Sequence, residues 1–139
     1  PAPGEVEDAH LLARGGTRTE DLPAVTSAAE ILEMQRRCRE VKTAEAVKQY
    51  VVRIAEETRR DRSVSLGASP RASLMLLTAS MAWALLHGRD YVLPDDVQRL
   101  AVPVLAHRIR LKAQAGYQQK SAEDVVRAIV GSLRVPTGL

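Results

Sequence analysis

Apolar residues recur along most of the chain at spacings of three and four positions, which is the periodicity of amphipathic helices. The pattern is clearest after residue 43, where one helical face would carry Val47, Tyr50, Val51, Ile54 and Ala55. The alternation of apolar and polar residues that is typical of half-buried strands is almost absent. The pattern therefore predicts an all-α fold, a helical bundle of five or six helices.

Capping signals indicate where several of these helices begin. Residues 27–30 and 121–124 each form a capping box, in which a serine and a carboxylate three residues later satisfy backbone N–H groups. Thr43 is expected to cap the helix that follows it. The first box opens a helix whose buried stripe would include Cys38. We interpret this thiol as a small core side chain, because no catalytic His or second Cys accompanies it.

The longest uncharged run covers residues 72–86. Ser69 is a suitable N-cap for this helix, Pro70 fits its first position, and Gly88 is suited to end it. Because the run is apolar nearly all round, we expect it to be the central helix of the bundle, with Trp83 in the core.

A further helix is predicted to begin at Pro94, with acidic residues in its first turn. Pro103 should kink or break this helix, because proline lacks an N–H and clashes with the preceding turn. The segments 63–68 and 112–120 are interpreted as a connector and a loop.

The beginning of the chain differs from the rest. Residues 4–13 are interpreted as a short helical arm that ends at two glycines, and residues 17–26 as a polar linker. We therefore expect an N-terminal arm and linker in residues 1–26 and the helical domain in residues 27–139.

Composition narrows the possible functions. The 139 residues suffice for one domain, and the single Cys offers neither an intrachain disulfide nor a metal-ligand pattern. The longest uncharged run falls short of the roughly 20 residues that span a bilayer, so we expect a soluble, cytoplasmic protein without membrane contact. A net charge of +3 permits anionic partners, but it is weaker than that of a dedicated nucleic-acid binder.

Arg71 is the position that most resembles a chemical site. A cation in the first turn of a helix opposes the positive end of the helix dipole, yet it adds a guanidinium to N–H groups that already favour an anion. One interpretation is an arginine that binds nucleotide phosphate. The other is a solvent-exposed arginine that tolerates a penalty of about 0.3 to 1 kcal/mol, and spacing alone favours this second interpretation.

Several spaced sequence blocks shift the balance toward the interpretation of Arg71 as a phosphate-binding residue. The chain resembles the C-terminal lid region of MoxR-type AAA+ ATPases, from about Pro3 to Pro136. The blocks that carry the resemblance are LGASPRAS at 66–73, GRDYV at 88–92, PDDV at 94–97 and VLAHR at 104–108. In that family the arginine of GASPRA is the sensor 2 residue, which reaches the terminal phosphate of ATP. The resemblance therefore implies a catalytic role for Arg71, and nucleotide contacts through Ser69, Pro70 and Arg71.

The resemblance also implies a parent protein that binds ATP with Mg²⁺, hydrolyses it, and forms a ring with neighbouring subunits, expected to be a hexamer. Such a parent would remodel or help to assemble client proteins. Its Walker A, Walker B, sensor 1 and arginine-finger residues have no counterparts in this chain. We therefore expect the chain alone to be inactive and to bind neither ATP nor Mg²⁺ tightly. Leu93 stands where relatives often carry a capping Thr.

A free-standing helical module that binds nucleic acid or protein through basic patches is the alternative. Two clusters suggest it, Arg36, Arg37 and Arg39, and Arg59, Arg60 and Arg62. Interleaved glutamates and the lack of aromatic side chains for base stacking count against nucleic acid. His107 is interpreted as structural, and Arg108 and Arg110 as solvated, with a subunit contact as the lesser alternative.

Overall fold

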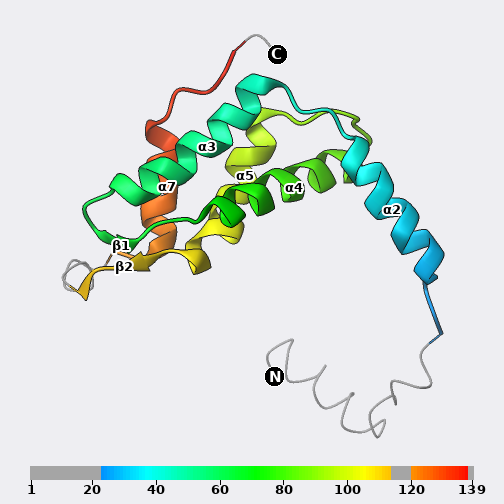
Figure 1. Ribbon diagram of the computed structural model, residues 1–139, viewed down its shortest axis with the longest axis horizontal. Coiled ribbons are helices and arrows are strands. Elements are labelled where there is room, and N and C mark those ends of the chain that lie inside the picture. The colour runs from blue at the N-terminus through cyan, green and yellow to red at the C-terminus, as the bar shows by residue number, and fades with distance from the viewer. Residues whose placement is uncertain (1–22, 114–119, 138–139) are drawn as a thin grey trace, which may run out of the picture. The chain divides into compact units, whose positions relative to one another are not determined.

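The computed structural model describes residues 23–113 and 120–137 of the chain. Figure 1 shows the helices, which dominate this part, together with one small antiparallel sheet. In chain order the elements are α2 (Ala28–Glu40), α3 (Glu45–Arg60), β1 (Val64–Leu66), α4 (Pro70–Leu86), α5 (Pro94–Leu105), the 3-10 helix η2 (Ala106–Arg108), β2 (Arg110–Leu111) and α7 (Ala122–Ser132). Five α-helices in the described residues confirm the predicted fold class, whereas the arm expected at residues 4–13 lies outside them.

The chain divides into two compact units, Pro1–Glu33 and Met34–Leu139. In the first unit the predicted capping box is confirmed. The Ser27 N–H donates to Glu30 Oε2 at 2.7 Å, and the Glu30 N–H donates to Ser27 Oγ at 3.2 Å. These hydrogen bonds, the one from the Ser27 N–H above all, lower the pKa of the Glu30 carboxyl.

The core of the second unit lies among α3, α4, α5 and α7. Helix α4 packs on α5 and α3, and α7 packs on α5 and α3. The face predicted for α3 is confirmed, since its buried residues are Val47, Tyr50, Val51, Ile54, Ala55 and Thr58. Helix α7 begins with the predicted box, in which the Asp124 N–H donates to Ser121 Oγ at 3.1 Å. The interior is built mainly from Val, Ile, Leu and Ala, as the absence of Phe requires.

The small sheet was not predicted. Strand β1 pairs antiparallel with β2, with Leu66 opposite Arg110 and Val64 opposite Leu111. The Lys112 N–H extends this pairing by donating to the Ser63 carbonyl at 2.8 Å. Segments of three and two residues are too short for alternation to show in the sequence. Tertiary packing, which brings the two segments together, decides their conformation.

Two helix boundaries differ from the prediction. Helix α3 begins at Glu45 after Ala44, so Thr43 does not cap it. The Thr43 hydroxyl is buried and has no hydrogen-bond partner in the described part of the chain. The break expected at Pro103 is absent, because helix α5 continues through Pro103 to Leu105 and then tightens into η2, whereas the alternative of a kink stays a prediction. The proline therefore lies inside the helix, and the change of helix type comes two residues later.

Two side chains predicted to lie in the core are only half-buried. Helix α2 has no buried residue, and Cys38 is half-buried with its sulfur 4.0 Å from the Thr78 carbonyl oxygen. Trp83 is also half-buried, because the Arg99 guanidinium covers its ring at 4.9 Å from the centroid. The predictions of a core cysteine and a core tryptophan are therefore wrong in degree.

Candidate functional site

The turn that connects β1 to α4 is fastened to the last turn of α3. A Cβ on Gly67 would lie 2.7 Å from the Arg59 Cα, so the two backbones approach too closely for any other residue. Ala68 is fully buried, and its N–H donates to Thr58 Oγ1 at 2.9 Å. The Ala68 carbonyl accepts a hydrogen bond from Arg59 Nε at 2.7 Å. These contacts fix the starting point of α4 against α3.

The first turn of α4 is capped as predicted. Ser69 is the N-cap, and its hydroxyl accepts a hydrogen bond from the Ala72 N–H at 3.3 Å, while Pro70 occupies the first helical position. The Ser69 carbonyl accepts from the N–H groups of Ala72 and Ser73 at 2.9 and 3.3 Å. Proline has no N–H to offer. Among the described residues, the Arg71 N–H is therefore the backbone donor of this turn that has no acceptor.

The Arg71 side chain is exposed and makes no hydrogen bond or ion pair with the described residues. It lines the N-terminal end of a shallow groove of about 660 Å³ that runs along α4. The other lining residues are Leu74, Met75, Thr78, Ala79 and Ala82. The mainly apolar groove thus ends at a residue that carries both a guanidinium and a free backbone N–H. Donors of this kind suit an oxyanion such as phosphate.

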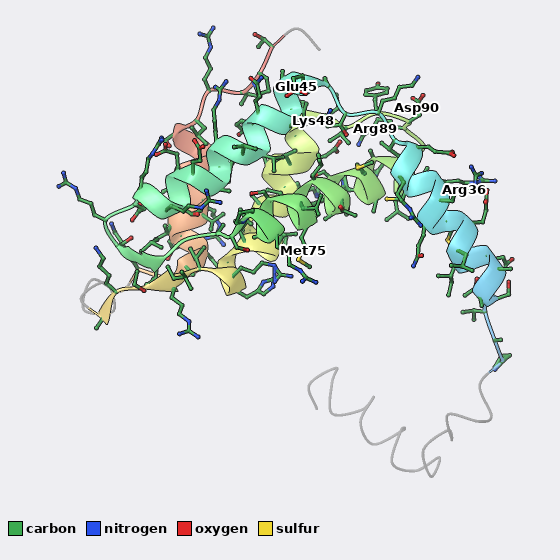
Figure 2. The ribbon with its side chains drawn as sticks, in the orientation of Figure 1. Arg36, Glu45, Lys48, Met75, Arg89 and Asp90 are labelled. Atoms are coloured by element: carbon green, nitrogen blue, oxygen red, sulfur yellow. The ribbon has the colours of Figure 1, made fainter. Side chains whose placement is uncertain are left out.

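Helix α4 is not covered all round, which corrects the prediction of a central helix. Its buried residues form a single stripe, Ala72, Leu76, Ser80 and Ala84. On the groove side Leu74 is 63% exposed and Met75, labelled in Figure 2, is 40% exposed. The uniformly apolar sequence could not distinguish the buried stripe from this open face, because both carry the same kind of residue.

The opposite end of α4 holds an ion pair that the sequence did not reveal. Arg89 donates to both carboxylate oxygens of Asp96 at 2.7 Å, and the Asp96 side chain is only 5% exposed. The Leu93 N–H also donates to Asp96 at 2.8 Å, so this carboxylate serves the helix start where Leu93 itself has no capping group. Burial raises the pKa of Asp96, but the hydrogen bonds from Arg89 and Leu93 outweigh it and lower the pKa overall.

Arg108 and Arg110 differ from each other, although both were predicted to be solvated. Arg110 is exposed, whereas Arg108 is half-buried and its Nε is buried without a hydrogen-bond partner. The Arg108 Nη1 lies 2.6 Å from His107 Nε2. The prediction is therefore wrong for Arg108, because η2 turns this side chain back against the domain.

The positive charge of the basic clusters that suggested nucleic-acid binding is partly balanced by glutamates of the same helices. Arg36 pairs with Glu40, and Arg60 pairs with Glu57 at 2.8 Å. The Arg59 Nε donates a hydrogen bond to the Ala68 carbonyl. Such pairs are typical of a solvated helix face, and they leave less positive charge for a phosphate backbone.

The described residues contain no group of three or more His, Cys, Asp or Glu side chains placed to hold a metal ion. In the same part of the chain, no helix combines the length and apolar character needed to cross a membrane.

The family-model match and the similar proteins agree on the family of this chain. The AAA lid domain family matches residues 56–129, more than half of the chain. The chain is 42% identical over 117 residues to the uncharacterized protein YeaC of Bacillus subtilis (strain 168), which covers 84% of this chain and 37% of YeaC. It is 31% identical over 143 residues to the chaperone MoxR1 of Mycobacterium tuberculosis, which covers 96% of this chain and 38% of MoxR1.

A solved structure shares the fold. A crystal structure of a Cytophaga hutchinsonii protein superposes with a TM-score of 0.85 at 23% identity, over 99% of this chain and 44% of that one. The chain thus spans less than half the length of each of these three proteins. It belongs to the AAA lid domain family, as the lid region of a MoxR-type AAA+ ATPase.

Proposed function

We propose that this lid takes part in ATP hydrolysis by its parent ATPase, with Arg71 as the sensor 2 residue that contacts the terminal phosphate. The observation that carries the proposal is the state of Arg71. Its guanidinium is exposed and has no partner among the described residues, and its backbone N–H has no acceptor there. The helix start that carries it is fixed by the Ser69 cap. No carboxylate of the described residues competes with a nucleotide phosphate for this guanidinium.

The role of Arg71 is electrostatic. The oxygens of the transferring phosphoryl group share negative charge, and a preorganised cation stabilises that charge without transferring a proton. Ser69 and Pro70 aim the side chain by setting where α4 begins. In the complete parent, residues outside this lid would hold Mg²⁺, which would supply further charge neutralisation at the phosphates. The parent's core provides the remaining groups of the active site.

The attachment of α4 gives a route from the phosphate to the rest of the lid. Gly67 and Ala68 lock the helix start to α3, and α4 packs directly on α5. A displacement of Arg71 when the terminal phosphate is lost therefore moves a packed unit and not a loose side chain. This coupling would drive the motion of the lid against the parent's own core. The parent would assemble with neighbouring subunits into a hexameric ring in the cytoplasm and would remodel client proteins.

The test is the substitution Arg71→Ala in the complete ATPase that carries this lid. We expect turnover at saturating ATP to fall by at least about tenfold, because one preorganised charge is removed from the transition state. ATP affinity should fall more than ADP affinity, since ADP lacks the terminal phosphate. Arg71→Lys should recover part of the turnover, because it keeps the charge but not the planar fork.

The matched control is Arg53→Ala on α3. Arg53 is also exposed and makes no ion pair with the described residues, so its loss changes the net charge equally. Turnover of this variant should equal that of the wild type. Unchanged turnover of Arg71→Ala at saturating ATP would contradict the sensor 2 assignment.

A further inference from the structure

Arg108 is held by the domain without being neutralised by it. The side chain is half-buried, its Nε is buried without a partner, and no carboxylate of the described residues pairs with it. Arg89, the other arginine of the described residues that is mostly withdrawn from solvent, donates to both carboxylate oxygens of Asp96. Withdrawing a guanidinium from water without an anion is unfavourable. The described residues therefore leave Arg108 able to bind an anion that comes from outside them.

His107 determines how Arg108 is presented. A guanidinium can only donate hydrogen bonds, so the 2.6 Å contact with Arg108 Nη1 requires His107 Nε2 to accept. The imidazole is then neutral, with its hydrogen on Nδ1. This contact occupies one terminal nitrogen of Arg108 and restricts the rotation of the guanidinium. The other terminal nitrogen, Nη2, has no partner among the described residues and is free to meet an anion.

The strand pairing joins the segment after Arg108 to the segment before α4. Leu66, at the end of β1, lies opposite Arg110, at the start of β2, in the antiparallel ladder. Ala68 belongs to the turn that fixes α4, and Arg71 follows three residues later. Helix α5, which leads into η2, also packs on α4 (Figure 1). Two arginines without a carboxylate partner in the described residues thus flank the small sheet, with Arg108 two residues before β2 and Arg71 five residues after β1.

This juxtaposition favours one class of anion. A single carboxylate would neutralise one of the two guanidiniums, whereas a chain of phosphates carries enough charge for both. We propose that Arg108, positioned by His107, is a second phosphate-binding residue of the nucleotide site that Arg71 serves. The inference rests on the proposed function, since it takes the nucleotide to lie at this end of α4. Arg108 contacts the phosphate chain, and His107 is a positioning residue that acts through Arg108.

The test measures nucleotide binding and turnover of Arg108 variants in the complete ATPase. Arg108→Ala should weaken ATP binding by about tenfold or more, the range of one hydrogen bond to a charged group. Arg108→Lys should bind better than Arg108→Ala. Arg108→Met, which keeps the apolar stem without the charge, should behave like Arg108→Ala and shows that lost packing is not the cause. Arg53→Ala is the control, with unchanged ATP affinity.

His107 has its own readout. His107→Ala should weaken ATP binding less than Arg108→Ala, because the charge remains but its orientation is lost. His107→Gln, whose side-chain oxygen can accept the same hydrogen bond, should restore binding. In the variant His107→Ala/Arg108→Ala, ATP affinity should match that of Arg108→Ala alone. Additive losses would show that His107 acts independently of Arg108 and would overturn its positioning role.

The outcomes separate this inference from the proposed function. Wild-type ATP affinity and turnover in folded Arg108→Ala and Arg108→Met, with Arg71→Ala impaired, would overturn the inference and leave the role of Arg71 standing. Loss of ring assembly with unchanged ATP affinity would assign Arg108 to a carboxylate of a neighbouring subunit and would also overturn it. Unimpaired Arg71→Ala would overturn the proposed function itself. The melting temperature of each variant verifies folding.

Discussion

The two ends of helix α4 use polar residues in opposite ways. At the C-terminal end, Gly88 adopts a φ of 70° and its N–H donates to the Leu85 carbonyl at 3.0 Å. Beyond it Arg89 is paired with buried Asp96. At the N-terminal end the backbone is equally well capped by Ser69, yet Arg71 has no partner among the described residues.

The difference indicates which charges serve the fold. Removing one partner of a charge pair that the domain neutralises by itself should lower the free energy of unfolding, because the other charge is left unpaired. A charge that the domain holds in place but leaves without an anion contributes little to stability, and it is available to a ligand or another chain. The predictions below test this division, beginning with the largest expected effect on the free energy of unfolding.

The largest effect is expected from Asp96→Ala. Removing this carboxylate leaves Arg89 without its anion and the Leu93 N–H without its acceptor. The free energy of unfolding should fall by about 3 kcal/mol. Urea denaturation followed by the fluorescence of Trp83 measures it. The control is Asp95→Ala at the neighbouring exposed position, where a change within about 0.5 kcal/mol is expected. Equal effects of the two substitutions would refute a special role for the ion pair.

Gly67→Ala should follow, with a loss of about 2 kcal/mol, because the new methyl group meets the backbone of Arg59 at 2.7 Å. Gly131→Ala is the matched control, since a Cβ there has nothing within 4 Å. Gly131 lies in helix α7, where alanine is favoured over glycine by up to about 1 kcal/mol, so this variant should gain stability. Shifts of the urea midpoint in opposite directions for the two variants would support the fastening of α4 to α3. An unchanged midpoint for Gly67→Ala would contradict it.

Acid should weaken the C-terminal end of α4. The pKa of Asp96 is lower in the folded chain than in the unfolded chain, so its ionised form favours folding. This contribution is complete above the unfolded pKa of about 3.9 and is lost as the pH falls through the folded pKa. The stability advantage of the wild type over Asp96→Asn, measured by urea denaturation from pH 7 to pH 3, should therefore shrink below about pH 4. An advantage independent of pH would exclude the carboxylate charge as its source.

The smallest effect on stability is expected from Arg71→Ala. Its side chain is exposed and unpaired among the described residues, so the free energy of unfolding should change by less than about 0.5 kcal/mol. Circular dichroism melting of Arg71→Ala and Arg89→Ala side by side gives the sharpest comparison of the two ends. A strong destabilisation by Arg71→Ala would mean that this arginine serves the fold, and the division between the ends would fail.

Local signals predicted the helices well. The capping boxes at Ser27 and Ser121, the N-cap Ser69 and the stop at Gly88 are all present. Each of these signals depends on residues within a single turn, so the chain carries the information locally. Thr43 shows the limit of such signals, because Ala44 forms the N-cap without a side-chain hydrogen bond. There the packing of the buried face of α3 outweighs one capping hydrogen bond.

The features that need distant partners could not be predicted in the same way. Asp96 resembled an ordinary acidic residue of a first turn, and its pairing with Arg89 depends on how the connection from α4 folds back. Strands β1 and β2 form because α3 and η2 bring two short segments together. The burial of Arg108 likewise follows from the turn of η2 and not from its neighbours in the sequence.

The sequence by itself determined most of the helices and their caps, because periodicity and capping act over a few residues. It also indicated Arg71 as the candidate site residue, through the resemblance to a family. Only the tertiary structure decided which face of α4 is buried, since Leu74 and Leu76 are equally apolar and differ only in what lies against them. It alone also separated the neutralised Arg89 from Arg108, because the pairing of a charge depends on residues that the fold brings from elsewhere in the chain.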